Sequence, residues 1–187
     1  SFGDIIWTLA DQTIAHKAWD GDFDTDWVNV ANWIGGVPGA TDSVVIPALQ
    51  PAHYSPTLPS STTIGSLEIQ TGGILNGGTS TELAINGGSG SWVNAGAFHP
   101  NTSTVIFTNA AATMGGTTDF YDLTIDPGAG LTMSTNNIAR VAGTMVNNGT
   151  LSAGLFVNTI EYNGGDQSII NPNGGSGGYY HLTLSGS

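Results

Sequence analysis

The sequence FYDLTI at residues 120–125 returns as YYHLTL at residues 179–184, and in both copies apolar and polar side chains alternate. Alternation with a period of two is the pattern of a β-strand with one buried face. Two further matches keep the same order along the chain: residues 92–98 with 145–151, and residues 104–107 with 159–162. The three pairs are offset by 59, 53 and 55 residues, which predicts one strand-rich unit repeated along an axis.

Strand-like segments in residues 59–187 recur at intervals of about 15 to 22 residues. Their central apolar residues are Leu67, Leu83, Val105, Leu123, Met145, Ile160 and Leu182. This spacing predicts an all-β chain folded as a parallel β-helix, or β-solenoid, in which coils stack and inward side chains form ladders. Each repeat of about 55 residues would then hold two or three coils. A β-sandwich is the alternative, although its strands normally recur every ~8–12 residues.

Glycine and asparagine mark the expected corners between strands, because both residues tolerate the positive φ that tight turns require. The chain contains 28 glycines and several Asn-Gly pairs. Asn94 and Asn147 occupy matching positions in the repeat. If coils stack in register, these two side chains should belong to one asparagine ladder.

The chain divides at residue 58 into two segments of different composition. Residues 1–58 are rich in Trp, Asp and Pro and do not repeat, whereas residues 59–187 contain the repeats. The first segment contains Trp7, Trp19, Trp27 and Trp33. Because the first coil of a solenoid has an open apolar face, we expect this segment to cap it, within one continuous domain. Tryptophans that stack on sugars are the alternative interpretation.

Both ends of the sequence contain apolar residues that predict assembly. The last strand-like segment has no capping element after it, and an unpaired strand is a template for further pairing. We therefore expect either further repeats of the same polypeptide or head-to-tail stacking of copies into a filament. The apolar start of the chain would act as a donated strand. The candidate assembly and capping residues are Phe2, Ile5, Ile6, Trp7, Leu182 and Leu184.

The chain is strongly acidic, with 14 acidic residues against only Lys17 and Arg140 and a formal net charge of −12. Such a surface repels phosphate backbones and anionic lipids but attracts divalent cations, so neither nucleic-acid binding nor membrane insertion is expected. The absence of cysteine excludes thiol catalysis, disulfides and cysteine-based zinc sites. Because scarce Lys and Arg leave few sites for trypsin-like proteases, we expect an extracellular or cell-surface location.

Four short motifs follow one another in the first part of the chain. They are W-x4-N-W at residues 27–33, G-x-x-P at 35–38, D-x-V-x-I-P at 42–47 and L-x-I-x-x-G at 67–72. Their order resembles a repeat module of secreted and cell-surface proteins of Bacteroidetes, many of them adhesin-like. The resemblance implies an exported, surface-associated stack of β-strands and no catalytic residues. Ser43 is a candidate for glycosylation, because Asp42-Ser43-Val44 resembles the short O-glycosylation motif of that group.

Residues 19–27 read WDGDFDTDW and contain the densest group of carboxylates in the chain. The candidate calcium ligands are Asp20, Asp22, Asp24 and Asp26. In a loop these side chains can converge as in D-x-D-x-D calcium sites, so Ca²⁺ is the candidate cofactor. An EF-hand is excluded because position 12 of such a loop would be Ala31 rather than glutamate. A solvated acidic loop anchored by its tryptophans is the alternative.

These features together predict a non-enzymatic, extracellular structural or adhesive module, able to assemble head to tail with copies of itself. The alternatives are a carbohydrate-binding module, with glycans as partners, and a polysaccharide-active β-helix enzyme. The histidines have no metal-ligand spacing and no neighbouring nucleophile motif. Asp119, Asp122 and Asp126 are the only close set of acids in the repeats, and a glycoside hydrolase needs two carboxylates near one another.

Overall fold

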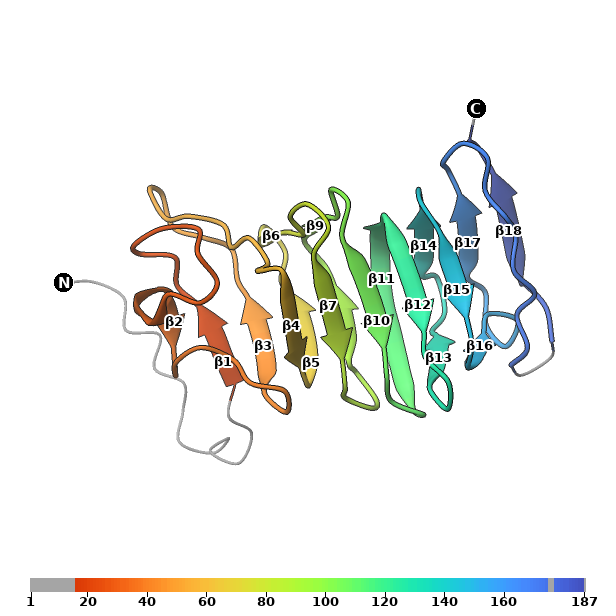
Figure 1. Ribbon diagram of the computed structural model, residues 1–187, viewed down its shortest axis with the longest axis horizontal. Coiled ribbons are helices and arrows are strands. Elements are labelled where there is room, and N and C mark those ends of the chain that lie inside the picture. The colour runs from red at the N-terminus through yellow and green to blue at the C-terminus, as the bar shows by residue number, and fades with distance from the viewer. Residues whose placement is uncertain (1–15, 175–176, 187) are drawn as a thin grey trace.

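A computed structural model describes residues 16–174 and 177–186, which form a parallel β-solenoid of about six turns. The predicted fold class is therefore confirmed. The described residues contain no α-helix, only a short 3-10 turn, η1 (Val30–Asn32). The coils stack along one axis, with β1 (His16–Trp19) and β2 (Trp33–Ile34) at one end and β18 (His181–Leu184) at the other (Figure 1).

The strands follow three faces of the solenoid. Face 1 consists of β4 (Ser61–Ile64), β7 (Glu82–Ile85), β10 (Thr104–Phe107), β12 (Asp122–Ile125) and β15 (Met145–Asn147). Face 2 consists of β1, β3 (Ser43–Ile46), β5 (Ser66–Ile69), β8 (Trp92–Asn94), the first half of β11 (Ala112–Phe120), β13 (Gly130–Met133) and β16 (Thr150–Ser152). Face 3 consists of β6 (Ile74–Asn76), β9 (Ala97–His99), the second half of β11, β14 (Ile138–Val141), β17 (Thr159–Tyr162) and β18.

Alternating burial along each strand explains why these segments form the solenoid. In β10 and β12 every second side chain is buried, as expected for strands with one face on the core. The ladder from Leu83 through Val105 and Leu123 to Met145 is in register on face 1. The predicted spacing of strand centres is thus correct over this stretch. Leu67 belongs to face 2, and Ile160 pairs with Leu182 on face 3, so the predicted series combines residues of three ladders.

Paired residues on successive coils are 18 to 27 residues apart, as between β10 and β12 and between β1 and β3. The sequence repeat of about 55 residues therefore spans between two and three coils. Because this is not a whole number of coils, matching segments lie on different faces: β12 is on face 1 and its sequence match β18 on face 3. The repeat reports the spacing of strands, whereas the stacking unit is one coil.

The expected ladder of Asn94 and Asn147 is wrong for the same reason. Asn94 pairs with Gly116 on face 2, whereas Asn147 pairs with Ile125 on face 1. The corner that contains Asn94 continues instead through Asn137, whose Oδ1 accepts a hydrogen bond from the Gly116 amide at 2.8 Å. Asn137 also donates to the carbonyl oxygen of Met114 at 2.7 Å, so an asparagine satisfies backbone groups at this corner, as expected, in a different pairing.

Buried aromatic rings fill the middle of the solenoid and bring its faces together. Trp92 is fully buried, and its ring centroid lies 5.3 Å from that of Phe98, 6.2 Å from Phe107 and 5.3 Å from Phe120. Its indole N–H donates to Thr118 Oγ1 at 3.0 Å. A tryptophan is tolerated in this core because its polar atom has a partner.

The N-terminal end is closed by the tryptophans of residues 16–58. Trp19, Trp27 and Trp33 are buried and pack against one another, with ring centroids 4.7 to 6.5 Å apart. The same segment also supplies stacked strands, because β3 pairs in parallel with β1 and with β5. The parallel ladder thus crosses the predicted boundary at residue 58. The candidate residues Phe2, Ile5, Ile6 and Trp7 lie outside the described part of the chain.

Candidate functional site

The four aspartates predicted as calcium ligands do not converge on one point, because Asp24 is used inside the loop. Asn32 is fully buried, and its Oδ1 accepts hydrogen bonds from the amides of Phe23 at 3.0 Å and Asp24 at 3.1 Å. Its Nδ2 donates to Asp24 Oδ1 at 2.7 Å. Asp24 also accepts from the Asp26 amide at 2.8 Å and from Asn29 Nδ2 at 3.0 Å. These hydrogen bonds, with that of Asn32 the largest cause, lower the pKa of the Asp24 carboxyl.

Asp26 also has a structural role in the same loop. Its Oδ1 accepts a hydrogen bond from the amide of Val28 at 3.1 Å, as in an Asx turn. Its backbone forms a parallel bridge with Thr57, which joins the loop to the following coil. Asp24 and Asp26 thus shape the loop, and both carboxylates have donors from the protein itself.

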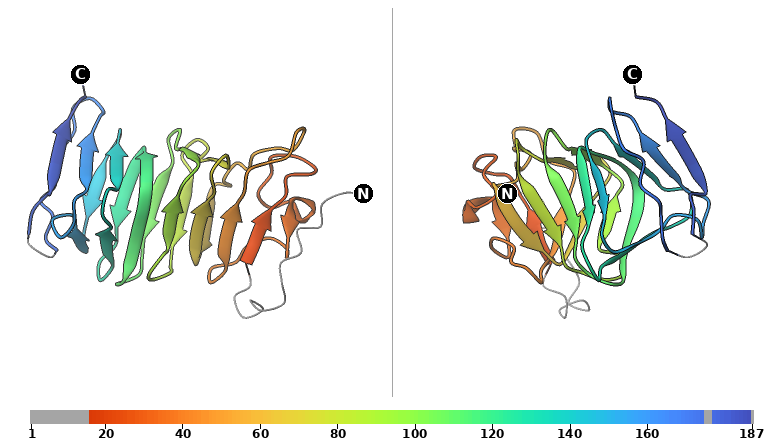
Figure 2. Two further views of the ribbon diagram at one scale, coloured as in Figure 1. Left: turned by 180° about the vertical axis from the view of Figure 1, so that it is seen from behind. Right: turned by 45° about the vertical axis from the view of Figure 1, so that its right-hand side comes forward.

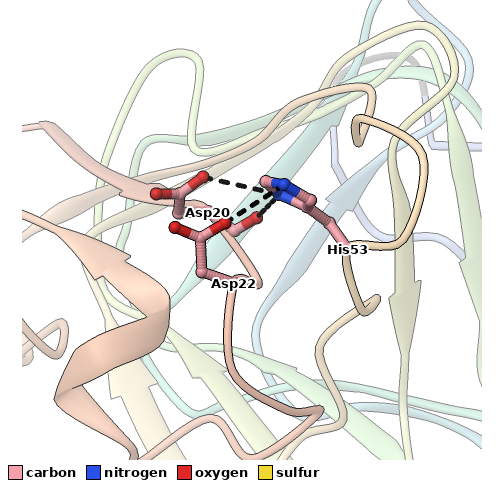
Figure 3. A group of neighbouring side chains, drawn as sticks. All are labelled: Asp20, Asp22 and His53. Atoms are coloured by element: carbon pink, nitrogen blue, oxygen red, sulfur yellow. Dashed lines mark hydrogen bonds and ion pairs between the residues drawn. The ribbon is translucent and has the colours of Figure 1, made fainter. Parts of the chain in front are cut away.

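Asp20 and Asp22 lie elsewhere, on either side of the His53 imidazole (Figure 3). His53 Nδ1 lies 2.8 Å from the carbonyl oxygen of Asp20 and 3.6 Å from its Oδ1. His53 Nε2 lies 3.1 Å from Asp22 Oδ1. One ligand atom from each of the three residues falls within 4.8 Å of the others. The arrangement is a compact set of two carboxylates and one imidazole, open to solvent.

Electrostatics within this cluster favour a positive charge. Burial is the largest cause that raises the pKa of Asp20, followed by the negative charge of Asp22, while His53 lowers it. A cation between the carboxylates, either a proton on the imidazole or a metal ion, would relieve their repulsion. The cluster is therefore the candidate metal centre of the described residues.

Sequence reasoning missed His53 because nothing close to it in the chain indicates a ligand. It lies 33 residues after Asp20 and has neither a second histidine nor an acid at a characteristic spacing. The fold brings it to the aspartates because the loop after β3 returns over the loop after β1. The amide of Tyr54 donates to the carbonyl of Gly21 at 2.9 Å, which fixes the two loops side by side.

The C-terminal end offers a second candidate site, an open strand edge. In β18, Leu182 pairs with Ile160 and Leu184 pairs with Tyr162, which are inward positions of β17. Ile160 is 0% exposed and Tyr162 2% exposed, whereas Leu182 is 40% and Leu184 61% exposed. The outer edge of β18 faces away from the stack, and no described strand pairs with it (Figure 2). Apolar side chains at inward positions are therefore uncovered here.

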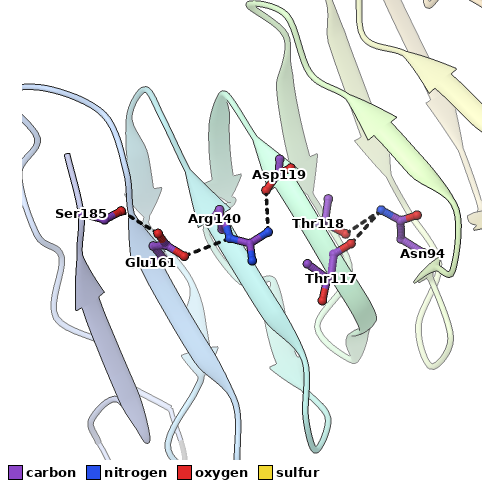
Figure 4. Close-up of polar contacts among 7 residues, drawn as sticks. All are labelled: Asn94, Thr117, Thr118, Asp119, Arg140, Glu161 and Ser185. Carbon is purple, nitrogen blue, oxygen red and sulfur yellow. Dashed lines mark hydrogen bonds and ion pairs between the residues drawn. The ribbon is translucent and has the colours of Figure 1, made fainter. Parts of the chain in front are cut away.

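The carboxylates considered for a hydrolase lie on different faces. Asp119 is on face 3, where its Oδ1 accepts from Arg140 Nη1 at 3.1 Å (Figure 4). Asp122 is on face 1, and its Oδ1 accepts from the Thr144 amide at 2.5 Å. Asp126 follows the end of β12. Asp119 and Asp122 thus each have a donor from the protein, and the structure does not bring the three acids together as a catalytic set.

Arg140 and Glu161 form a polar row with Asp119 across successive strands of face 3 (Figure 4). Arg140 Nε donates to Glu161 Oε2 at 2.9 Å, and the Ser185 hydroxyl donates to Glu161 Oε1 at 2.6 Å. The Ser185 hydrogen bond is the largest cause that lowers the pKa of Glu161, and Arg140 adds to it. The row connects coils across their outer surface, where such ion pairs contribute little each.

A shallow open groove of about 550 Å³ lies at the start of face 1. It is lined by Thr79, Ser80, Thr81, Glu82, Thr102, Thr104, Tyr121 and Asp122. Hydroxyls, carboxylates and an aromatic ring are groups that bind sugars, so a glycan site would be sought here. Ser43, the candidate for glycosylation, begins β3, is half-buried, and its Oγ accepts from Ser66 Oγ at 2.9 Å. Its modification stays a prediction.

The sequence matches no known family model, and neither curated proteins nor solved structures include a match to it. The resemblance to Bacteroidetes surface modules therefore rests on the quoted motifs alone. In the described part of the chain, no helix has the length and hydropathy needed to cross a membrane.

Proposed function

We propose that this chain is a non-enzymatic structural module of an extracellular surface, which assembles with copies of itself head to tail. The observation that carries the proposal is the distribution of exposed apolar side chains. In a structural module the chemistry lies in the ends of the stack, because strand edges and open cores are what one coil offers to the next.

Exposed large apolar residues gather near the two ends of the solenoid. Those of the first turns are Phe23, Val28, Val30, Ile34 and Tyr54. Those of the last two turns are Leu155, Phe156, Val157, Ile169, Tyr180, Leu182 and Leu184. Between these groups, Val93 on β8 is the one large apolar residue in this exposure class among the described residues. Grouping of this kind marks interaction surfaces, whereas isolated exposed residues are ordinary.

The register of β18 supports strand addition at the C-terminal end. Leu182 and Leu184 continue ladders whose preceding members, Ile160 and Tyr162, are buried. A further coil on β18 would bury both leucines and pair the free backbone edge. At the other end β2 is only two residues long and pairs antiparallel with β1, leaving Ile34 exposed. A contact between these two unlike ends is heterologous and therefore continues into a filament.

The charge of the chain sets the conditions under which copies should associate. Each copy has a formal net charge of −12, so copies repel one another at low ionic strength. Salt screens this repulsion, with a Debye length of about 10 Å at 0.1 M. Self-association should therefore strengthen as monovalent salt is added, as expected for an apolar contact between like-charged molecules.

Sedimentation velocity and electron microscopy over a range of protein and salt concentrations test the proposal. Leu184→Asp should weaken self-association, and so should Ile34→Asp at the opposite end. Val93→Asp is the matched control, since Val93 is as exposed as Leu182 but lies in the middle of the stack. If Leu184→Asp acts alone and Ile34→Asp does not, the contact is tail to tail. A monodisperse monomer under all conditions would rule out homotypic assembly.

The carbohydrate-binding and enzymatic alternatives are tested with the same protein. A glycan array and a panel of acidic and neutral polysaccharides should give neither binding nor cleavage. Binding that falls when Tyr121, which lines the face 1 groove, is replaced by alanine would favour the carbohydrate-binding alternative instead.

A further inference from the structure

We propose that Asp20, Asp22 and His53 bind one divalent metal ion of the zinc class, which holds together the two loops at the N-terminal end. The proposal is independent of head-to-tail assembly, because it concerns loops within one molecule. It also replaces the four-aspartate calcium site with a different set of ligands. Asp24 and Asp26 are outside this set, because their carboxylates accept hydrogen bonds within the loop.

The orientation of the imidazole is the first argument. His53 Nδ1 lies 2.8 Å from the carbonyl oxygen of Asp20, which can only accept, so Nδ1 bears a hydrogen. Nε2 is then directed at Asp22 Oδ1, 3.1 Å away, and needs either a second proton or a cation there. Metal-binding histidines are typically oriented in this way, with one ring N–H donated to a backbone carbonyl and the other nitrogen on the metal.

The state of the two carboxylates is the second argument. Among the described residues, no backbone amide, hydroxyl or side-chain amide donates a hydrogen bond to the carboxylate of Asp20 or Asp22, in contrast to Asp24. The two acids are close enough for Asp22 to raise the pKa of Asp20. Two adjacent carboxylates without other donors and beside one imidazole form a donor set that a cation completes.

The loops that hold these residues are fixed before any ion binds. On one side of His53, the Trp19 indole N–H donates to the carbonyl of Tyr54 at 2.6 Å. The amide of Tyr54 donates to the carbonyl of Gly21 at 2.9 Å. Gly21 has φ +72°, and a Cβ there would collide with the Tyr54 carbonyl oxygen, so only glycine permits this close approach. A site whose backbone is already in place loses little entropy on binding.

The donor set indicates which ion would bind. Zinc and cobalt accept imidazole nitrogen together with carboxylate oxygen, and three protein ligands leave a position for water. Calcium needs six to eight oxygen ligands, and here only two carboxylates are free to supply them. The partial exposure of all three side chains leaves room for solvent ligands. We therefore expect Zn²⁺ and Co²⁺ to bind more tightly than Ca²⁺ or Mg²⁺.

The experiment is metal titration of the EDTA-treated full chain at neutral pH. Zn²⁺ binding would be measured by calorimetry and Co²⁺ binding by its visible d–d absorption, which reports ligand geometry. His53→Gln should weaken binding by at least the roughly 10- to 100-fold that removal of an outer-shell partner costs. Asp22→Asn should act similarly. His99→Gln is the matched control, because His99 is exposed on β9 and contacts only Asn76 Oδ1, at 3.3 Å.

Three results would overturn the proposal. Zn²⁺ binding that is equally tight in wild type and His53→Gln would place the ion elsewhere. Equal loss in His99→Gln and His53→Gln would indicate scattered histidine binding. Calcium binding at one equivalent that does not depend on His53 would favour an oxygen-only site. A fold check by circular dichroism on each variant distinguishes loss of a ligand from loss of structure, and Asp22→Asn keeps the test valid if His53→Gln misfolds.

Discussion

Two residues on one ladder, Ile160 and Leu182, offer a direct test of the open C-terminal end. They are in-register partners on β17 and β18 and have similar apolar side chains. Ile160 is 0% exposed, because a coil lies on each side of it, whereas Leu182 is 40% exposed. Truncation of each to alanine therefore compares the same chemistry inside the stack and at its edge.

The expected magnitudes follow from burial. Ile160→Ala removes a fully buried side chain and leaves a cavity, which costs about 2–5 kcal/mol of the free energy of unfolding. Full burial of a leucine contributes about 1.5–3 kcal/mol, so the roughly 60% buried side chain of Leu182 accounts for about 1–2 kcal/mol at most. Water fills the space that Leu182→Ala leaves, so no cavity cost is added. Leu184→Ala should cost less still, because Leu184 is 61% exposed.

Urea unfolding followed by far-UV circular dichroism measures these differences, with the slope m compared among variants. The comparison should be made at low protein concentration and repeated at high concentration. At low concentration Ile160→Ala should be the more destabilised by at least about 1 kcal/mol. Equal destabilisation at low concentration would refute the reasoning, since β18 would then be covered within the monomer. A cost of Leu182→Ala that grows with concentration would indicate that another copy covers it.

Two further predictions concern corners and pH. Gly116→Ala should destabilise the chain well beyond Gly128→Ala, because both glycines have positive φ but only at Gly116 would the Cβ collide with a backbone atom, the Asn94 carbonyl oxygen; thermal unfolding of the pair checks this. The pKa of Glu161 is lowered on folding, chiefly by the Ser185 hydrogen bond, so its stabilising contribution is complete above the ordinary value of 4.5 and is lost as pH falls through the lowered folded value. The stability advantage of wild type over Glu161→Gln should therefore shrink below about pH 4.5, and an advantage that grows on acidification would contradict the assigned hydrogen bond.

Strand identity was predictable because it depends on local pattern. In segments such as Leu123-Thr124-Ile125, alternate side chains point to opposite sides of a strand, whatever surrounds it. The spacing of strands then made stacking coils the best fold, and Leu83, Val105 and Leu123 were placed on one ladder correctly. The tryptophans of the first segment were also expected to close an end, and Trp19, Trp27 and Trp33 are buried there.

Only the tertiary structure decided which ladder each strand joins and which residues meet at the ends. Coil length varies from 18 to 27 residues, because corners differ in length, so a sequence period cannot assign faces; Asn94 and Asn147 were misplaced for this reason. His53 reaches Asp20 through the return of a distant loop, which leaves no local pattern. Ile160 and Leu182 are alike in sequence, and only the presence or absence of a further coil makes one buried and the other exposed.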